Sequence, residues 1–202
     1  LKDKWNFDIV VLDAGHGGID GGASNGTVLE KDLNLLITQE LKKELETSGF
    51  KVIMTRTADE MIGSRDSISA TKKADMRARR AIMDSNKNAI FVSVHMNKFP
   101  DESCKGAQVF YGRRNSDSEL LAEAISESII KNVQPENHRL PKKAESNVFL
   151  LKAAVQPAVI VECGFLSNKA ELSKLIDPDY QKKLAAAVSK GISEYYDSLN
   201  SQ

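Results

Sequence analysis

The chain has 202 residues, of which 41% are hydrophobic and 28% are charged, and this composition is typical of one globular domain with a full core. Basic and acidic residues each number 28, so the formal net charge is zero and no overall field favours nucleic acid or an acidic membrane surface. No run approaches the roughly 18 apolar residues that span a membrane, and Cys104 and Cys163 are too few for a disulfide framework, so we expect two free thiols.

The first quarter of the chain predicts two strands and one helix around a glycine-rich loop. A short apolar run at 8–12 predicts a buried strand that leads into the loop 13–18. Leucine and isoleucine recur at helical spacing over 29–48, and Gly49 supplies the stop. A second strand is predicted at 51–56.

The next segment is predicted to expose a long loop before it returns to the core. The polar stretch 57–74 is typical of a surface loop, and loops of that length are usually functional or mobile. Asp75 is expected to cap a helix that runs to about Ser85. A third buried strand, at 89–94, then delivers His95 at its end.

The second half continues the alternation of strands and helices. The pattern predicts a strand at 106–111, a helix at 117–133 and a polar, proline-bearing loop at 134–146. Two further strands are predicted at 147–151 and 158–161.

Ser167 and Asp177 are expected to cap two closing helices, the second with Pro178 at its first position. The whole alternation predicts an α/β fold: a single twisted sheet of about six strands, mainly parallel but mixed, with helices on both faces. We expect one domain over residues 1–202, with a core from about residue 8 to residue 197.

Four side chains with metal or acid–base chemistry lie where predicted strands end or a helix begins. They are His16, Glu30, His95 and Glu162. Because binding crevices of open α/β sheets lie outside the carboxyl ends of the strands, we expect these groups to converge. Imidazole nitrogen and carboxylate oxygen suit zinc, and a catalytic zinc site typically has three protein ligands and one open position. The pattern therefore favours a metallohydrolase with one zinc ion held by His16, Glu30 and His95.

Glu162 is the candidate catalytic base. It interrupts the apolar run 158–161, where a carboxylate is costly to bury unless it is paired or lies near a metal. Such a carboxylate can accept a proton from water and return it to a departing nitrogen. We expect Asp13 or a backbone carbonyl to orient His16 from behind.

Each of these signals also has a purely structural interpretation. A histidine at a strand end, such as His95, is often only a satisfied polar residue. The loop around His16 could be a tight turn or a phosphate-binding loop, although it lacks the Lys-Ser/Thr of a P-loop. Glu30 could simply favour the first turn of a helix. Cys163 could be a nucleophile, but a buried cysteine is usually inert.

Two other groups are expected to be solvated. His138 lies in a polar loop. A basic cluster on the helix that follows residue 71 is predicted to be an exposed helix face. Its members are Lys72, Lys73, Arg77, Arg79 and Arg80.

Four ordered motifs together resemble the zinc-dependent N-acetylmuramoyl-L-alanine amidases, over nearly the whole chain. The motifs are 12–18 (LDAGHGG), 30–34 (EKDLN), 93–97 (SVHMN) and 161–168 (VECGFLSN). The resemblance implies that His16, Glu30 and His95 bind one zinc ion and that Glu162 is catalytic. It also implies cleavage of the amide between the lactyl group of N-acetylmuramic acid and L-Ala of the stem peptide.

Further motifs resemble the germination-specific branch of this family, found in spore formers. They are 64–65 (SR), 75–77 (DMR), 106–111 (GAQVFY) and 147–152 (NVFLLK). The branch implies removal of stem peptides from spore-cortex peptidoglycan as a step toward muramic-δ-lactam, with a muramic-acid deacetylase completing the lactam. The chain departs from the family at Met96, Ala14 and Cys163, where Ala, Pro and a small or apolar residue are usual.

The same resemblance suggests substrate-binding or site-shaping roles for Asn97 and Arg139, and weaker ones for Arg65 and Arg77. We see no cell-wall-binding repeat, so the catalytic domain or an accessory protein would anchor the peptidoglycan. The chain begins Leu1-Lys2 without a methionine, which fits either a trimmed chain or a mature protein whose export signal is missing from the sequence. The resemblance implies an exported protein of the cell wall or spore-cortex space.

Two rival functions use the same residues. A zinc exopeptidase also has His and Glu ligands, but it commonly recognises a charged peptide terminus. The other alternative is a non-catalytic glycan-binding module on the same fold, in which the four motifs would have no catalytic role. The substrate profile separates these alternatives.

Overall fold

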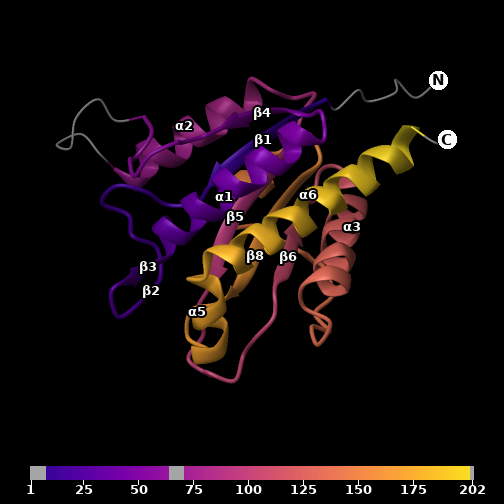
Figure 1. Cartoon of the computed structure of the whole chain (residues 1–202). Coiled ribbons are helices and arrows are strands. Elements are labelled where there is room, and N and C mark those ends of the chain that lie inside the picture. Colours follow the sequence, from indigo (N-terminus) through magenta and orange to yellow (C-terminus); the bar gives the residue numbers. More distant parts are fainter. Residues whose placement is uncertain (1–7, 64–70, 201–202) are drawn as a thin grey trace.

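The apolar runs of the sequence form one six-stranded sheet in the computed structural model, which describes residues 8–63 and 71–200. The strands lie in the order β4-β1-β5-β8-β6-β7, and all of them except β7 are labelled in Figure 1. Their bounds are β1 Ile9–Ala14, β4 Lys51–Met54, β5 Ile90–Asn97, β6 Gln108–Tyr111, β7 Lys142–Lys143 and β8 Ala158–Phe165. Strands β4, β1, β5 and β8 are parallel, whereas β6 runs antiparallel to β8 and parallel to β7. The predicted mixed, mainly parallel sheet is therefore confirmed.

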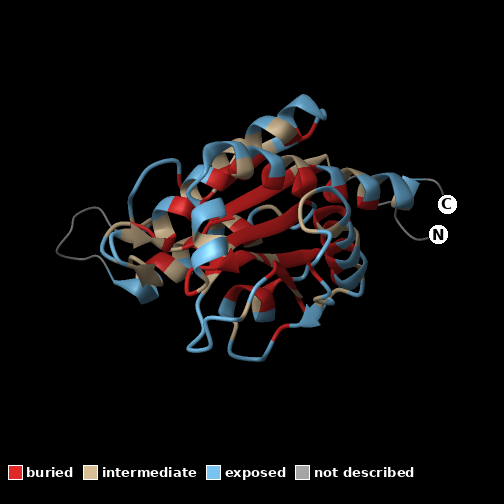
Figure 2. Cartoon of the chain, turned by 60° about the horizontal axis from the view of Figure 1, so that its bottom comes forward, coloured by how far each residue is buried: buried red, intermediate tan, exposed pale blue. Residues whose placement is uncertain are grey.

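Helices cover both faces of this sheet. On one face lie α1 (Glu30–Thr47), α3 (Asp117–Asn132), α5 (Lys169–Leu175) and α6 (Pro178–Asn200), and α1 and α6 cross the front of the sheet in Figure 1. On the other face lie α2 (Lys72–Asp84) and α4 (Phe149–Ala153). Figure 2 shows the buried strands at the centre, enclosed by helices whose outer sides are exposed. None of the described helices is long and apolar enough to cross a membrane.

Alternate residues of each central strand enter different cores, as a sheet buried on both faces requires. Along β5, Val92 and Val94 pack against the α1, α3 and α6 side. Phe91, between Ile90 and Val92 in sequence, packs instead with Met83 of α2 and Leu151 of α4. Ser93, His95 and Glu162 share this second face by strand alternation and register, because His95 pairs with Glu162.

The predicted strand at 147–151 is wrong. Its apolar residues form the short helix α4, whose Leu150 and Leu151 are buried against the sheet face. A short apolar run has no clear periodicity, so it fits a buried strand or a buried helix equally well. The sixth strand is instead β7, a two-residue strand in the segment expected to be a loop.

Two of the expected helix caps are also wrong, and one is confirmed. Thr71 caps α2 by accepting from Ala74 N, and Asp75 lies buried inside the first turn. Asn168, not Ser167, caps α5. Asp177 does cap α6, because its Oδ1 accepts a hydrogen bond of 3.0 Å from Asp179 N.

Strands β5 and β8 extend further than predicted. They run to Asn97 and Phe165, so His95 and Glu162 lie within the carboxyl-terminal parts of the strands instead of after them. Within a regular strand a side chain has a fixed direction, and these two candidate residues are therefore held by the sheet itself. A small hairpin that was not predicted, β2 (Ser24–Asn25) and β3 (Val28–Leu29), links the glycine-rich loop to α1.

Candidate metal centre

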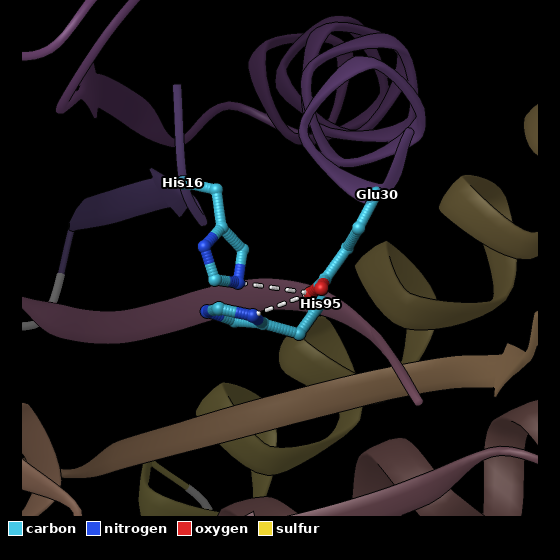
Figure 3. Close-up of side chains that lie close together, drawn as sticks. All are labelled: His16, Glu30 and His95. Atoms are coloured by element: carbon cyan, nitrogen blue, oxygen red, sulfur yellow. Dashed lines mark hydrogen bonds and ion pairs between the residues drawn. The ribbon is translucent and has the colours of Figure 1, made fainter. Parts of the chain in front are cut away.

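Three of the predicted site residues converge at the carboxyl edge of the sheet (Figure 3). His16 follows β1, Glu30 is the first residue of α1 and His95 lies in β5. Their ligand atoms lie within 4.8 Å of one another. Glu30 Oε1 is 2.9 Å from His95 Nδ1 and 3.3 Å from His16 Nε2. Two imidazole nitrogens and one carboxylate oxygen thus point at a common position.

Glycines make room for this convergence. A Cβ on Gly15 would lie 2.3 Å from the His95 ring, and a Cβ on Gly22 would lie 2.5 Å from Glu30 Oε2. Gly22 also has a φ of +68°, which side chains rarely adopt. The glycine-rich loop therefore lets the backbone approach the three donor groups more closely than any side chain would allow.

Asp20 orients His16, and the predicted role of Asp13 is wrong. The Nδ1 atom of His16 lies 3.0 Å from Asp20 Oδ2, which leaves Nε2 directed at Glu30. Burial would raise the pKa of Asp20, but the hydrogen bond and charge of His16, with those of Lys72, lower it below the usual value. A carboxylate behind a histidine in this way fixes its tautomer and orientation.

Glu30 is a buried carboxylate held in its ionised form. Its Oε2 accepts a hydrogen bond of 2.7 Å from Ala23 N, and its Oε1 accepts one of 3.2 Å from Met96 N. Burial opposes ionisation, but the hydrogen bonds and charges of His16 and His95 lower the pKa of Glu30 far below its ordinary value. The side chain is therefore an acceptor group at neutral pH.

Glu162 lies beside this cluster on the neighbouring strand. It pairs in register with His95, and its Oε2 atom is buried with no hydrogen-bond partner among the described residues. Burial raises the pKa of Glu162, the positive charge of His95 lowers it, and the negative charge of Glu30 raises it again; the net shift is upward. A buried carboxyl group with a free oxygen and a raised pKa is suited to exchanging a proton.

Cys163, next to Glu162, is not part of the site. It points into the opposite core, among the residues that contact α1, α3 and α6. Burial raises the pKa of its thiol far above the ordinary value, so no thiolate nucleophile forms there. Both cysteines are free, as predicted.

Beneath the cluster the structure corrects the predicted basic face of α2. Arg77 and Arg80 are exposed as expected, but Arg79 is only 1% exposed. It pairs with Asp13 at 2.6 Å and with Asp75 at 2.7 Å. The arginine that looked solvated in the sequence is therefore part of the floor of the site.

The candidate substrate residues lie at or against the ends of strands β5 and β8, or outside the described residues. Asn97 is half-buried at the end of β5, two residues after His95. Arg139 is not among the residues that line the cavity at the cluster; its guanidinium lies 4.7 Å from the centre of the Phe165 ring, at the end of β8. Arg65 lies outside the described residues. His138 is exposed, as predicted.

A cavity of about 210 Å³ opens beside the histidines. Its lining includes the polar residues His16, Asp20 and Lys72 and apolar residues of α2 and α4, among them Met76 and Phe149. The sequence did not predict Asp20, Lys72 or these apolar residues as parts of the site. The only available signal was the spacing of four residues between His16 and Asp20 in a loop.

Comparisons with known proteins find a matching family and similar proteins. A family model described as N-acetylmuramoyl-L-alanine amidase matches residues 10–194. The germination-specific N-acetylmuramoyl-L-alanine amidase of Bacillus subtilis (strain 168) is 34% identical over 190 residues, which cover 93% of this chain and 79% of that protein.

Solved structures of amidases are similar to this chain in sequence and fold. The CwlD amidase from Clostridioides difficile, in complex with the GerS lipoprotein, is 40% identical, with a TM-score of 0.88 over 94% of this chain and 98% of that one. An N-acetylmuramoyl-L-alanine amidase from Clostridium difficile 630 is 31% identical, with a TM-score of 0.81 over 96% of this chain and 98% of that one.

Proposed function

The chain belongs to the N-acetylmuramoyl-L-alanine amidase family, whose enzymes cut peptidoglycan, and we propose that it acts as a zinc hydrolase on spore-cortex peptidoglycan. The bond cut is the amide between the lactyl group of N-acetylmuramic acid and L-Ala of the stem peptide. We take residues 1–202 to act as a single catalytic domain. The observation that carries the zinc proposal is the convergence of His16, Glu30 and His95 within 4.8 Å.

The donor set fits a zinc ion. His16 Nε2, His95 Nδ1 and Glu30 Oε1 are the ligand types that catalytic zinc takes, and three of them leave a position open. When bound, zinc lowers the pKa of a coordinated water and polarises a carbonyl group. We propose that one ion is held by these three residues, with Asp20 fixing the orientation of His16.

Glu162 then serves as the general base and acid. Its carboxylate accepts a proton from the water that attacks the amide carbonyl carbon, and it returns that proton to the nitrogen of L-Ala as the C–N bond breaks. The products are the lactyl carboxylate of N-acetylmuramic acid and a stem peptide with a free amino terminus. The raised pKa of Glu162 favours the second half of this cycle, because a protonated carboxyl must be available to the leaving group.

We propose that Asn97 and Arg139 bind the substrate or shape the site. Asn97 is two residues beyond His95 and offers a half-buried amide group at the edge of the sheet. Arg139 is fixed by a hydrogen bond of 2.7 Å from its Nε to Lys105 O and by the Phe165 ring. A fixed cation at this edge suits a carboxylate of the stem peptide.

The spore-cortex assignment rests on the relatives. One is a germination-specific amidase, and the CwlD amidase is solved in complex with the GerS lipoprotein. We propose that this chain likewise acts outside the cell, in the cell wall or cortex, with an accessory protein. Its product would then be the substrate of a muramic-acid deacetylase that completes the muramic-δ-lactam.

The test is digestion of purified cortex peptidoglycan with the protein, with zinc or with a chelator, followed by mass analysis. Zinc-dependent release of intact stem peptides, with no cleavage of free peptides, is expected. Cleavage of free peptides would favour an exopeptidase instead. No release at saturating zinc, from a sample that binds zinc, would contradict unaided amidase action by this chain, and no zinc binding would contradict the metal site.

A further inference from the structure

Arg79 uses all three of its guanidinium nitrogens on the loop that carries His16 and on its own helix. Nη1 donates to Asp13 Oδ1 at 2.6 Å and to Ala14 O at 2.7 Å. Nη2 donates to His16 O at 2.5 Å, and Nε donates to Asp75 Oδ2 at 2.7 Å. The side chain is 1% exposed. Arg79 therefore ties α2 directly to the backbone of a candidate zinc ligand 63 residues earlier.

His16 needs such a restraint. Its φ is +61°, and it is the one non-glycine residue with positive φ in the described parts of the chain. A side chain in the left-handed region is disfavoured unless the surroundings hold it there, and such residues cluster at functional sites. Arg79 supplies such a restraint through the hydrogen bond from its Nη2 to the carbonyl oxygen of His16.

Arg56, two residues after the end of β4, binds the same loop. Its Nε donates to Ala14 O at 2.9 Å, and its Nη2 donates to Gly15 O at 3.0 Å. The two arginines together bind the carbonyl oxygens of three consecutive residues, 14 to 16. Since all three carbonyls are held by cations, the turn has little freedom to rotate and the His16 ring is held toward Glu30.

We propose that Arg79 is a positioning residue for the metal site, an inference that rests on the proposed zinc function. It holds the His16 backbone in its left-handed conformation, so that Nε2 faces Glu30 and His95 before the metal arrives. Preorganised ligands lose less conformational freedom on binding, and the zinc affinity rises accordingly.

An arginine is required at this position. The planar guanidinium presents donors in fixed directions, whereas a lysine ammonium is a single point of charge on a flexible stem. Lysine at position 79 could keep one of the contacts to Asp13 and Asp75 but could not also reach the carbonyl oxygens of Ala14 and His16. The Arg79→Lys variant therefore keeps the charge and removes the positioning.

The test compares Arg79→Lys with Arg80→Lys. Arg80 is the next residue of α2, and it is exposed and paired with Asp84 at 3.1 Å. Zinc is titrated into each metal-free protein against a chromophoric chelator, with circular dichroism as the check on folding. We expect the zinc Kd of Arg79→Lys to rise by about 10- to 100-fold, and that of Arg80→Lys to stay within about twofold of the parent.

Activity at saturating zinc supplies a second measurement. If Arg79 acts only through the metal, excess zinc should restore most of kcat in Arg79→Lys. A folded Arg79→Lys with unchanged zinc Kd and a lower melting temperature would show a merely structural role and would overturn the inference. A parent protein that binds no zinc would overturn the proposed function, and this inference with it.

Asp75→Asn covers the case in which Arg79→Lys does not fold. This variant keeps the shape of Asp75 and weakens its hold on Arg79 Nε, so a smaller loss of zinc affinity is expected, about threefold or more. An unchanged Kd in folded Asp75→Asn would then count against the proposal.

Discussion

His16 Nδ1 and Asp20 Oδ2 lie 3.0 Å apart, and this contact decides which nitrogen of the ring faces the other two donor groups. A proton on Nδ1 is donated to the carboxylate, which leaves the lone pair of Nε2 on the side of Glu30. Lys72 Nζ lies 3.1 Å from the same Asp20 oxygen. The loop thus contains its own partner for the histidine, only four residues further along the chain.

Removing that partner should weaken zinc binding. Asp20→Ala is expected to raise the zinc Kd by about 10- to 100-fold, the usual effect of losing a carboxylate behind a ligating histidine. The zinc Kd of Asp20→Asn should lie between that of the parent protein and that of Asp20→Ala, because the asparagine amide oxygen still accepts a hydrogen bond from His16 Nδ1. Calorimetric titration measures both, with Asp84→Ala, at a half-exposed surface pair with Arg80, as the control. Equal affinity in Asp20→Ala and the parent protein would contradict this role.

Glu162→Gln should retain zinc and lose most turnover. The amide has nearly the shape of the carboxyl group but carries no proton between water and leaving nitrogen, so kcat should fall by about 10²- to 10⁴-fold. Release of stem peptides measures the rate, and metal analysis measures zinc content. Glu145→Gln, an exposed substitution, is the control. A fully active Glu162→Gln would show that another group is the base.

Asp13 should contribute strongly to stability through Arg79. Asp13→Ala leaves a buried guanidinium with only one carboxylate partner, and losing one member of a buried pair typically costs about 3–5 kcal/mol. Asp8→Ala removes only the exposed pair with Lys51, worth about 0–1 kcal/mol. Urea unfolding of both variants gives the comparison. Equal urea midpoints for Asp13→Ala and Asp8→Ala would contradict the predicted contribution of Asp13 to stability.

The sequence predicted the sheet and the convergence of three donor side chains because both follow from simple rules. Continuous apolar runs marked the buried parallel strands, and donor side chains at their ends converge wherever the strands are parallel. The sequence alone therefore predicted that His16, Glu30 and His95 lie close together. The helix at 29–48 also matches α1 within one residue at each end.

What the sequence did not predict depends on contacts between distant segments. Nothing in the periodicity of α2 shows that Arg79 turns inward while Arg77 and Arg80 stay exposed, because its partner Asp13 lies 66 residues away. Asp20 contacts His16 in a loop where His16 adopts a positive φ, a conformation that the sequence pattern does not reveal. The segment 147–151, expected to be a strand, contains most of α4, whose leucines pack against a sheet face built from other segments.

Zinc occupancy should fall on acidification, and the fall should begin as the pH drops through the raised pKa of His95. Burial alone would lower the pKa of His95, but its hydrogen bond to Glu30 and the charges of Glu162, Glu30 and Asp13 raise it above 6.5 in the metal-free protein. The proton on His95 therefore stabilises the metal-free fold below pH 6.5, and this contribution is lost as pH rises through the raised pKa.

Zinc and the proton compete for His95, so the sign for the metal is the opposite: zinc binding is favoured above the raised pKa and lost as pH falls through it. Zinc content at a fixed free zinc concentration, measured from about pH 8 to about pH 4, tests this. Occupancy that stays flat over this range would argue against histidine ligation.

Gly15→Ala should damage the metal site without unfolding the protein. The added Cβ would lie 2.3 Å from the His95 ring, so the imidazole must shift away from Glu30, and zinc affinity should fall by about tenfold or more. Gly26→Ala is the control: its φ of +59° is strained for alanine, but no atom lies within 4 Å of the new Cβ. Zinc titration and thermal unfolding of both variants separate the two effects. Gly26→Ala should lose a little thermal stability and keep its zinc affinity. In Gly15→Ala the loss of zinc affinity should be the larger effect. If Gly15→Ala bound zinc as tightly as the parent protein, His95 could not be a ligand in the position described.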